Sequence, residues 1–64
     1  MDDKQLIEAL GGQSATARRL NKVVGADIYT RYRVYQWATR NRIPPYEKLR
    51  FARIWKLAEK DAKT

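Results

Sequence analysis

The order of apolar and polar residues divides the chain into helical segments. The first is predicted over residues 3–10, where apolar side chains recur every three or four positions and acidic residues occupy the first turn. Gly11 and Gly12 are a stop signal after it. The apolar positions of this segment are Leu6, Ile7 and Leu10.

A second helix is predicted from near Gln13 or Ser14. Its narrow apolar face is made by Ala17, Leu20 and Val24. The segment 21–29 that follows has two interpretations. Either the helix continues to a turn at Gly25 and Ala26, or a loop covers apolar side chains of its own. The side chains covered in the second interpretation are Val23, Val24 and Ile28.

Residues 30–40, TRYRVYQWATR, are predicted to form the third helix. Thr30 is a good N-cap because its hydroxyl can accept a hydrogen bond from an orphan backbone N–H, and Asp27 is the rival cap. The buried side of the helix is made by Val34, Trp37 and Ala38. The outer side carries Tyr32, Gln36 and Thr39, flanked by Tyr35 and Arg40, with Arg31 and Arg33 near the N-terminal end.

The fourth predicted helix runs from Pro45 to about Lys60, because a proline starts a helix well and Pro44 breaks the one before it. Its apolar stripe is Phe51, Ile54, Trp55 and Ala58. Leu49 and Leu57 fall outside that stripe. They either complete the core of a monomer or form the surface of a homodimer. The sequence therefore predicts an all-α, four-helix domain.

Charge and composition narrow the chemistry of this domain. Fourteen Lys and Arg against seven Asp and Glu give a net charge of +7 and a pI near 10.2. Residues 18–56 hold eleven basic and two acidic side chains, a local excess of +9. Such a field attracts polyanions. The chain has no Cys and no His, no paired carboxylates at useful spacing and no glycine-rich phosphate loop. We therefore expect no metal, no cofactor, no small-molecule substrate and no enzymatic activity.

The apolar runs are too short for a membrane partner, since a spanning helix needs about 20 apolar residues. The acidic N-terminus does not have the pattern of a signal peptide. The absence of cysteine suits a reducing compartment, and the expected location is the cytoplasm.

Two consecutive helices, the second with a basic outer side, are the pattern of a helix-turn-helix motif, here over about residues 13–40. The segments GGQSATARRL, RVYQW and RIPP, in that order, resemble the Cro-type phage repressors and the related Cro-like antitoxins and transcriptional regulators. The resemblance covers residues 6–55. It implies a lambda-repressor-like fold, a bacterial host cell and a phage or prophage origin.

Carried over residue by residue, the resemblance assigns four kinds of role. Gln13 opens the bracing helix and faces phosphate, while Thr30 caps the recognition helix. The groove-facing positions are Arg31, Tyr32, Tyr35 and Gln36. The core positions are Ala17, Leu20, Val34 and Trp37. The chain departs from the family at Asn21, where a glycine is usual, and in the length of the segment between Leu20 and Thr30.

The predicted function is sequence-specific binding of an operator in double-stranded DNA, by a repressor that acts as a homodimer at least when bound. The expected DNA-binding residues are Gln13, Thr30, Arg31, Tyr32, Arg33, Tyr35, Gln36, Thr39 and Arg40, and the expected dimer surface is Leu49 and Leu57. The alternative is a basic nucleic-acid-binding or antitoxin-like module without strong sequence specificity.

Overall fold

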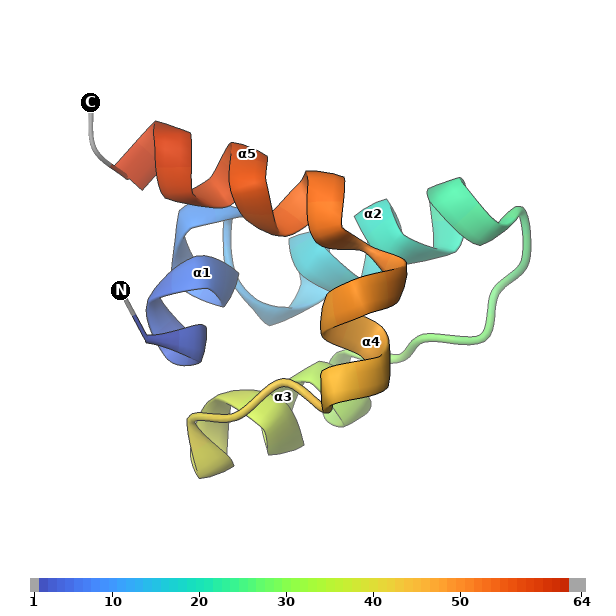
Figure 1. The fold of residues 1–64 in the computed structure, drawn as a ribbon. Helices are drawn as coiled ribbons and strands as arrows, with labels where there is room; N and C mark the ends of the chain where they lie inside the picture. Colours follow the sequence, from blue (N-terminus) through green and yellow to red (C-terminus); the bar gives the residue numbers. More distant parts are fainter. Residues whose placement is uncertain (1, 63–64) are drawn as a thin grey trace.

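A computed structural model describes residues 2–62, and all the secondary structure within this range is helical. The five helices are α1 (Asp3–Ala9), α2 (Gln13–Val24), α3 (Arg31–Arg40), α4 (Pro45–Arg50) and α5 (Ala52–Ala62). Figure 1 shows α5 along one end of the molecule and α3 at the other, with α1 and α2 between them. The prediction of an all-α domain is confirmed.

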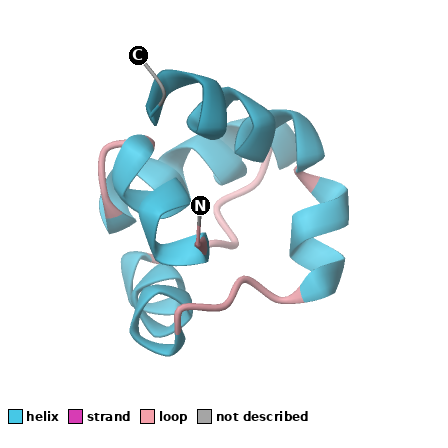
Figure 2. Ribbon diagram, turned by 60° about the vertical axis from the view of Figure 1, so that its left-hand side comes forward, coloured by secondary structure: helices cyan, strands magenta, loops and turns pink. Residues whose placement is uncertain are grey.

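The core forms where α1 packs against both α3 and α5 and where α2 packs against α3. The predicted apolar stripes of all the segments meet there. The buried apolar residues are Leu6, Ile7, Ala17, Leu20, Tyr29, Val34, Trp37, Ile43, Phe51, Ile54, Trp55 and Ala58. Both tryptophans are therefore core residues. Figure 2, turned from the first view, shows α4 as a separate short helix to one side of this core.

The prediction of one continuous helix from Pro45 to Lys60 is wrong, because the helix breaks at Phe51 and residues 2–62 form five helices instead of four. Phe51 leaves the helical region, with φ −113° and ψ 34°. The bend turns α4 sharply away from α5 (Figure 1), while the Phe51 ring stays buried. The predicted apolar stripe begins only at Phe51, so its periodicity gives no signal of a break at that residue.

The predicted helix ends are mostly confirmed. The Thr30 hydroxyl accepts a hydrogen bond from the Arg33 N–H at 3.1 Å, so Thr30 and not Asp27 caps α3. Gly25 ends α2 in the left-handed region, with φ 72°. Asn41 ends α3 in the same region, with φ 53°, which an asparagine tolerates better than most residues.

The segment 21–29 follows the first interpretation, because α2 continues to Val24 and a turn follows at Gly25. The second interpretation is wrong, since Val23 and Ile28 are exposed. Tyr29 is buried in their place and is only 3% exposed. Its ring packs edge-on against Trp37 and Phe51, with centroids 6.1 and 5.5 Å away. One aromatic side chain thus anchors the connection to the core.

The Asn21 side chain fixes the conformation of this connection. Its Oδ1 accepts hydrogen bonds from the N–H groups of Ile28 and Tyr29, at 3.1 and 2.7 Å. Its Nδ2 donates to the Tyr29 carbonyl at 2.8 Å and to Asp27 Oδ1 at 3.1 Å. A glycine at this position has no side chain to make these bonds. Asn21 therefore compensates for the long connection between α2 and α3.

The N-terminal helix holds the connection between α3 and α4. Asp3 Oδ2 accepts a hydrogen bond from the Ile43 N–H at 2.8 Å, and its Oδ1 pairs with Lys48 Nζ at 2.7 Å. The Lys4 N–H donates to Asn41 Oδ1 at 2.9 Å. Burial alone would raise the pKa of Asp3, but the Lys48 ammonium and the Ile43 N–H outweigh it and lower that pKa.

Candidate nucleic-acid interface

The outer side of α3 is a ridge of exposed polar and aromatic side chains. Because Val34 and Trp37 point into the core, the helical repeat turns Tyr32, Gln36 and Thr39 outward, and all of them are exposed. Tyr32 is 67% exposed, and its ring stacks on that of Tyr35 with centroids 6.3 Å apart. The two tyrosines form one aromatic cluster on the ridge.

A shallow hollow lies on the α2 side of this ridge. It is lined by Gln13, Arg31, Tyr32 and Tyr35. Gln13 is the first residue of α2, and the preceding Gly12 provides no side-chain cap. The first N–H groups of an uncapped helix carry partial positive charge. The hollow thus combines a guanidinium, a helix N-terminus and two phenol rings.

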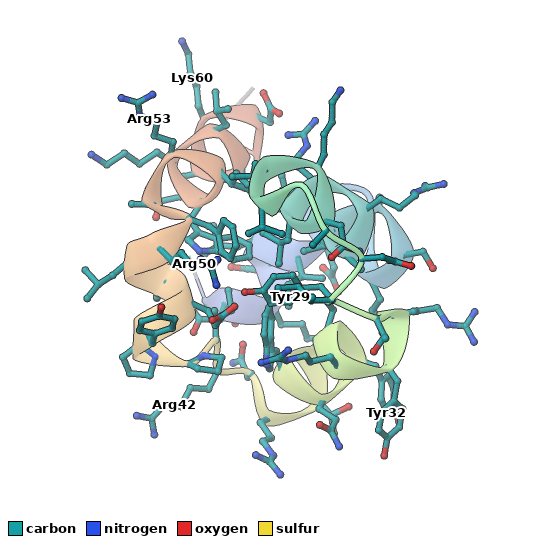
Figure 3. All side chains as sticks on the ribbon, turned by 90° about the vertical axis from the view of Figure 1, so that its right-hand side faces the viewer. Tyr29, Tyr32, Arg42, Arg50, Arg53 and Lys60 are labelled. Carbon is teal, nitrogen blue, oxygen red and sulfur yellow. The ribbon has the colours of Figure 1, made fainter. Side chains whose placement is uncertain are left out.

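A second hollow lies on the other side of the ridge, toward the start of α4. It is lined by Gln36, Trp37, Arg40, Arg42, Pro44 and Pro45. Arg42 lies on the connection that Asp3 and Lys4 hold in place, and Figure 3 shows it projecting outward beside this connection. The ridge and the two hollows define the α3 face, whose polar members are Gln13, Arg31, Tyr32, Tyr35, Gln36, Thr39, Arg40 and Arg42.

Two of the predicted DNA-binding residues lie apart from this ridge. The Arg33 guanidinium lies over the Tyr29 ring, 5.0 Å from its centroid, on the side of the α2–α3 connection. The Thr30 hydroxyl already accepts the Arg33 N–H as the cap of α3. The remaining predicted residues are brought together on the α3 face.

The α3 face has the chemistry of a binding surface. Its lining contains cations, amides and phenols, and the residues lining its two hollows include no carboxylate. Among residues 2–62 there is no group of three or more His, Cys, Asp or Glu that could hold a metal ion. The pKa of Tyr29 is raised by its burial and by the neighbouring Glu47 carboxylate, but Tyr29 lies beneath the surface.

The two leucines of the predicted dimer surface are exposed, Leu49 at 81% and Leu57 at 51%. The interpretation that they complete a monomer core is therefore wrong. Both lie away from α3, on the helices α4 and α5.

Two residues that shape the site, Asn21 and Asp3, are missing from the predicted set. Arg42, just past the predicted third helix, is expected from the sequence to hold phosphate together with Arg40. Asn21 and Asp3 both accept hydrogen bonds from backbone N–H groups elsewhere in the chain. Tyr29 is eight positions from Asn21, and Ile43 is 40 positions from Asp3. A local pattern contains no signal for such contacts.

Comparisons of this chain with family models, with curated proteins and with solved structures each gave no match. The resemblance to Cro-type repressors therefore stays a prediction. Within the described part of the chain, every helix is too short or too polar to cross a membrane.

Proposed function

We propose that the protein binds double-stranded DNA sequence-specifically, with α3 lying in the major groove. The observation that carries this proposal is the composition of the α3 face, where a helix exposes tyrosines and a glutamine between arginines. The major groove, about 12 Å wide, admits one α-helix, and its base edges offer donors and acceptors to such side chains.

The ridge supplies the residues for reading bases. Gln36 can make paired hydrogen bonds to adenine, and Arg31 can do the same to guanine. Tyr32 and Tyr35 offer hydroxyl groups for hydrogen bonds and ring surface for the thymine methyl group.

The flanks supply the residues for holding phosphate. Arg40 and Arg42 line the hollow on one side, and Gln13 with the uncapped start of α2 lies on the other. A groove-bound helix has a DNA strand on each side, so the arginines on one flank and the partial positive charge of the α2 N-terminus on the other match the two backbones. Phosphate contacts supply affinity and register, while the ridge supplies specificity.

The packing of α2 against α3 supports a helix-turn-helix arrangement, in which α2 braces the reading helix. The connection of residues 25–30 is longer than in the Cro-type pattern, and Asn21 and Tyr29 hold it. Repression by occupying an operator follows from the Cro-type resemblance. It requires no chemistry from the protein.

The test is selection of duplexes from a random-sequence pool, followed by affinity measurements for the selected duplex and a scrambled one of equal length. We expect a preference of at least about a hundredfold, a low value for a specific binder. Gln36→Ala should reduce this preference. Glu8→Ala, an exposed change on α1, should leave it as in wild type. Equal affinity for all duplexes would contradict sequence-specific reading and favour the alternative of a general basic module.

A further inference from the structure

A second exposed surface lies on α4 and α5, at the end of the molecule remote from Tyr32. One hollow there is lined mainly by apolar groups and includes Val23, Leu49, Phe51, Arg53 and Ile54. A second hollow is lined by Arg53, Lys56, Leu57 and Lys60. Arg53 lines both hollows, which places them next to each other. The exposed members, here called the α5 face, are Val23, Leu49, Arg53, Lys56, Leu57 and Lys60.

The α5 face has two properties that rarely occur together on a surface that faces only water. Its three apolar side chains are exposed. Leu49, at 81%, is the most exposed large apolar residue among residues 2–62. Its polar members are all cations. Figure 3 shows Arg53 and Lys60 projecting from the same end of the molecule, opposite Tyr32.

The charge of this face argues against a second copy as its occupant. A two-fold axis through Leu57 would gather Arg53, Lys56 and Lys60 of both copies around one contact, in a chain whose net charge is already +7. Of these cations, only Arg53 would then face a carboxylate, that of Asp61 in the second copy, so the contact would keep an excess of positive charge. Like charges at an interface disfavour association.

The apolar members argue against nucleic acid as the occupant. A phosphate backbone rewards cations but not the burial of leucines. A protein segment that presents carboxylates around apolar side chains satisfies both properties. Arg53 and Leu57 are one helical turn apart, about 6 Å along α5, so a helix with anchors at i and i+4 has the spacing to reach both hollows.

We propose that the α5 face binds an acidic amphipathic helix of a partner protein. Its apolar side chains lie in the hollows beside Leu49 and Leu57, and its carboxylates pair with Arg53, Lys56 and Lys60. This inference does not depend on DNA binding by the α3 face, so each can fail without the other. The predicted homodimer through Leu49 and Leu57 becomes the competing occupant.

The probe is a fluorescent synthetic helical peptide of about 20 residues that repeats leucine at helical spacing between glutamates. Its binding to the full chain is measured by anisotropy. We expect saturable binding that weakens about tenfold for Leu57→Asp, since a half-buried leucine anchor is lost and a like charge is introduced. Arg53→Glu should weaken it by a similar factor.

Two controls make this test specific. Lys4→Glu on α1 changes the net charge as Arg53→Glu does and should leave peptide binding within about twofold of wild type, as a distant exposed charge is screened. A peptide with glutamines in place of glutamates should bind more weakly than the acidic peptide. Sedimentation of the wild-type chain gives its oligomeric state, and circular dichroism establishes that each variant is folded.

The proposal is overturned if the acidic peptide does not bind, or if it binds equally to wild type and Leu57→Asp. It is also overturned if the wild-type chain sediments as a dimer that Leu57→Asp dissociates, since a second copy then covers the α5 face. Equal loss of binding in Lys4→Glu and Arg53→Glu would mean general attraction to a basic chain, and would overturn it too. None of these results bears on the DNA preference, which is measured separately.

Discussion

The α3 face and the α5 face are both basic, but they differ in what accompanies the cations. On the α3 face the arginines flank tyrosines and a glutamine, side chains with hydrogen-bonding groups. On the α5 face the cations flank valine and leucines, which have only apolar surface. The net charge of the whole chain, +7, does not distinguish the two faces. The neighbours of each cation, and not the charge itself, distinguish a surface suited to DNA from one suited to an acidic protein.

The two faces also differ in how they are supported. The ends of α3 depend on tertiary hydrogen bonds from Asn21, Asp3 and Lys4. Most of the α5 face, including all its cations, lies on a regular helix of 11 residues that packs directly on α1. Loss of the hydrogen bonds that hold the ends of α3 should therefore weaken binding at the α3 face more than binding at the α5 face.

The largest effect is expected for Asn21→Ala, which removes the partners of three backbone groups in the α2–α3 connection. We expect the free energy of unfolding to fall by about 2 to 4 kcal/mol, since each unsatisfied group costs about 1 to 3 kcal/mol where it is shielded from water. Urea denaturation measures this loss. Lys22→Ala, an exposed change on the same helix, should stay within about 0.5 kcal/mol of wild type.

Asn21→Ala should also weaken DNA binding more than peptide binding at matched folded fraction, because the loosened connection leads directly into α3, whereas Val23 is the only member of the α5 face beside it. Equal weakening of both would show that the two faces do not have separate supports.

A smaller effect is expected for Gln36→Ala, in the discrimination between the selected and the scrambled duplex. The loss should be about 1 to 3 kcal/mol, the contribution of one paired contact to a base. Competition binding at fixed salt measures it. The change should not alter the affinity for the acidic peptide. A uniform loss on both duplexes would instead make Gln36 a phosphate contact.

Next in size is the salt dependence of DNA binding. Arg40→Gln should reduce the slope of log K against log salt concentration by about 1, because one phosphate contact is lost. Arg53→Gln removes the same charge from the α5 face and should leave the slope unchanged. If both changes reduce the slope equally, the DNA covers both faces and the distinction between them fails.

The smallest effect is expected for Asp3→Asn, which removes the ion pair with Lys48 and weakens the tie to Ile43. At neutral pH the loss of stability should be about 1 kcal/mol. The folded-state pKa of Asp3 lies below 3.8, so its contribution is present above pH 3.8 and is lost as the pH falls through the lower folded value. Wild type and Asp3→Asn should therefore converge in stability in strong acid, as pH-dependent thermal melts would measure.

The sequence predicted the helices and most of the core, because both follow from the local periodicity of apolar residues. Capping residues such as Thr30 and Gly25 also marked helix ends. The sequence did not predict the bend at Phe51, since the apolar stripe begins at that residue and gives no signal of a change in direction there. One of its two interpretations of residues 21–29 placed Val23 and Ile28 under the α2–α3 connection, and neither identified Tyr29 as the buried residue. The burial of Tyr29 depends on the aromatic partners Trp37 and Phe51, which only the folded chain brings together.

Most of the candidate site was predictable because one helix carries it, and the helical repeat alone separates Tyr32 and Gln36 from Val34 and Trp37. The position of Arg33 over Tyr29 and that of Arg42 beside Arg40 were not predictable. Both depend on connections whose geometry is set by hydrogen bonds between residues far apart in the chain. The same reason explains why Leu49 and Leu57 were recognised as surplus apolar residues but not as members of a cationic face.

The most direct test of DNA binding by α3 is an NMR titration of the isotope-labelled chain with the selected duplex. We predict that the largest amide shifts occur in α3, at the start of α2 and around Arg42, while residues 53–60 change little. Large shifts along residues 53–60 with small ones in α3 would place the DNA on the α5 face and contradict the account.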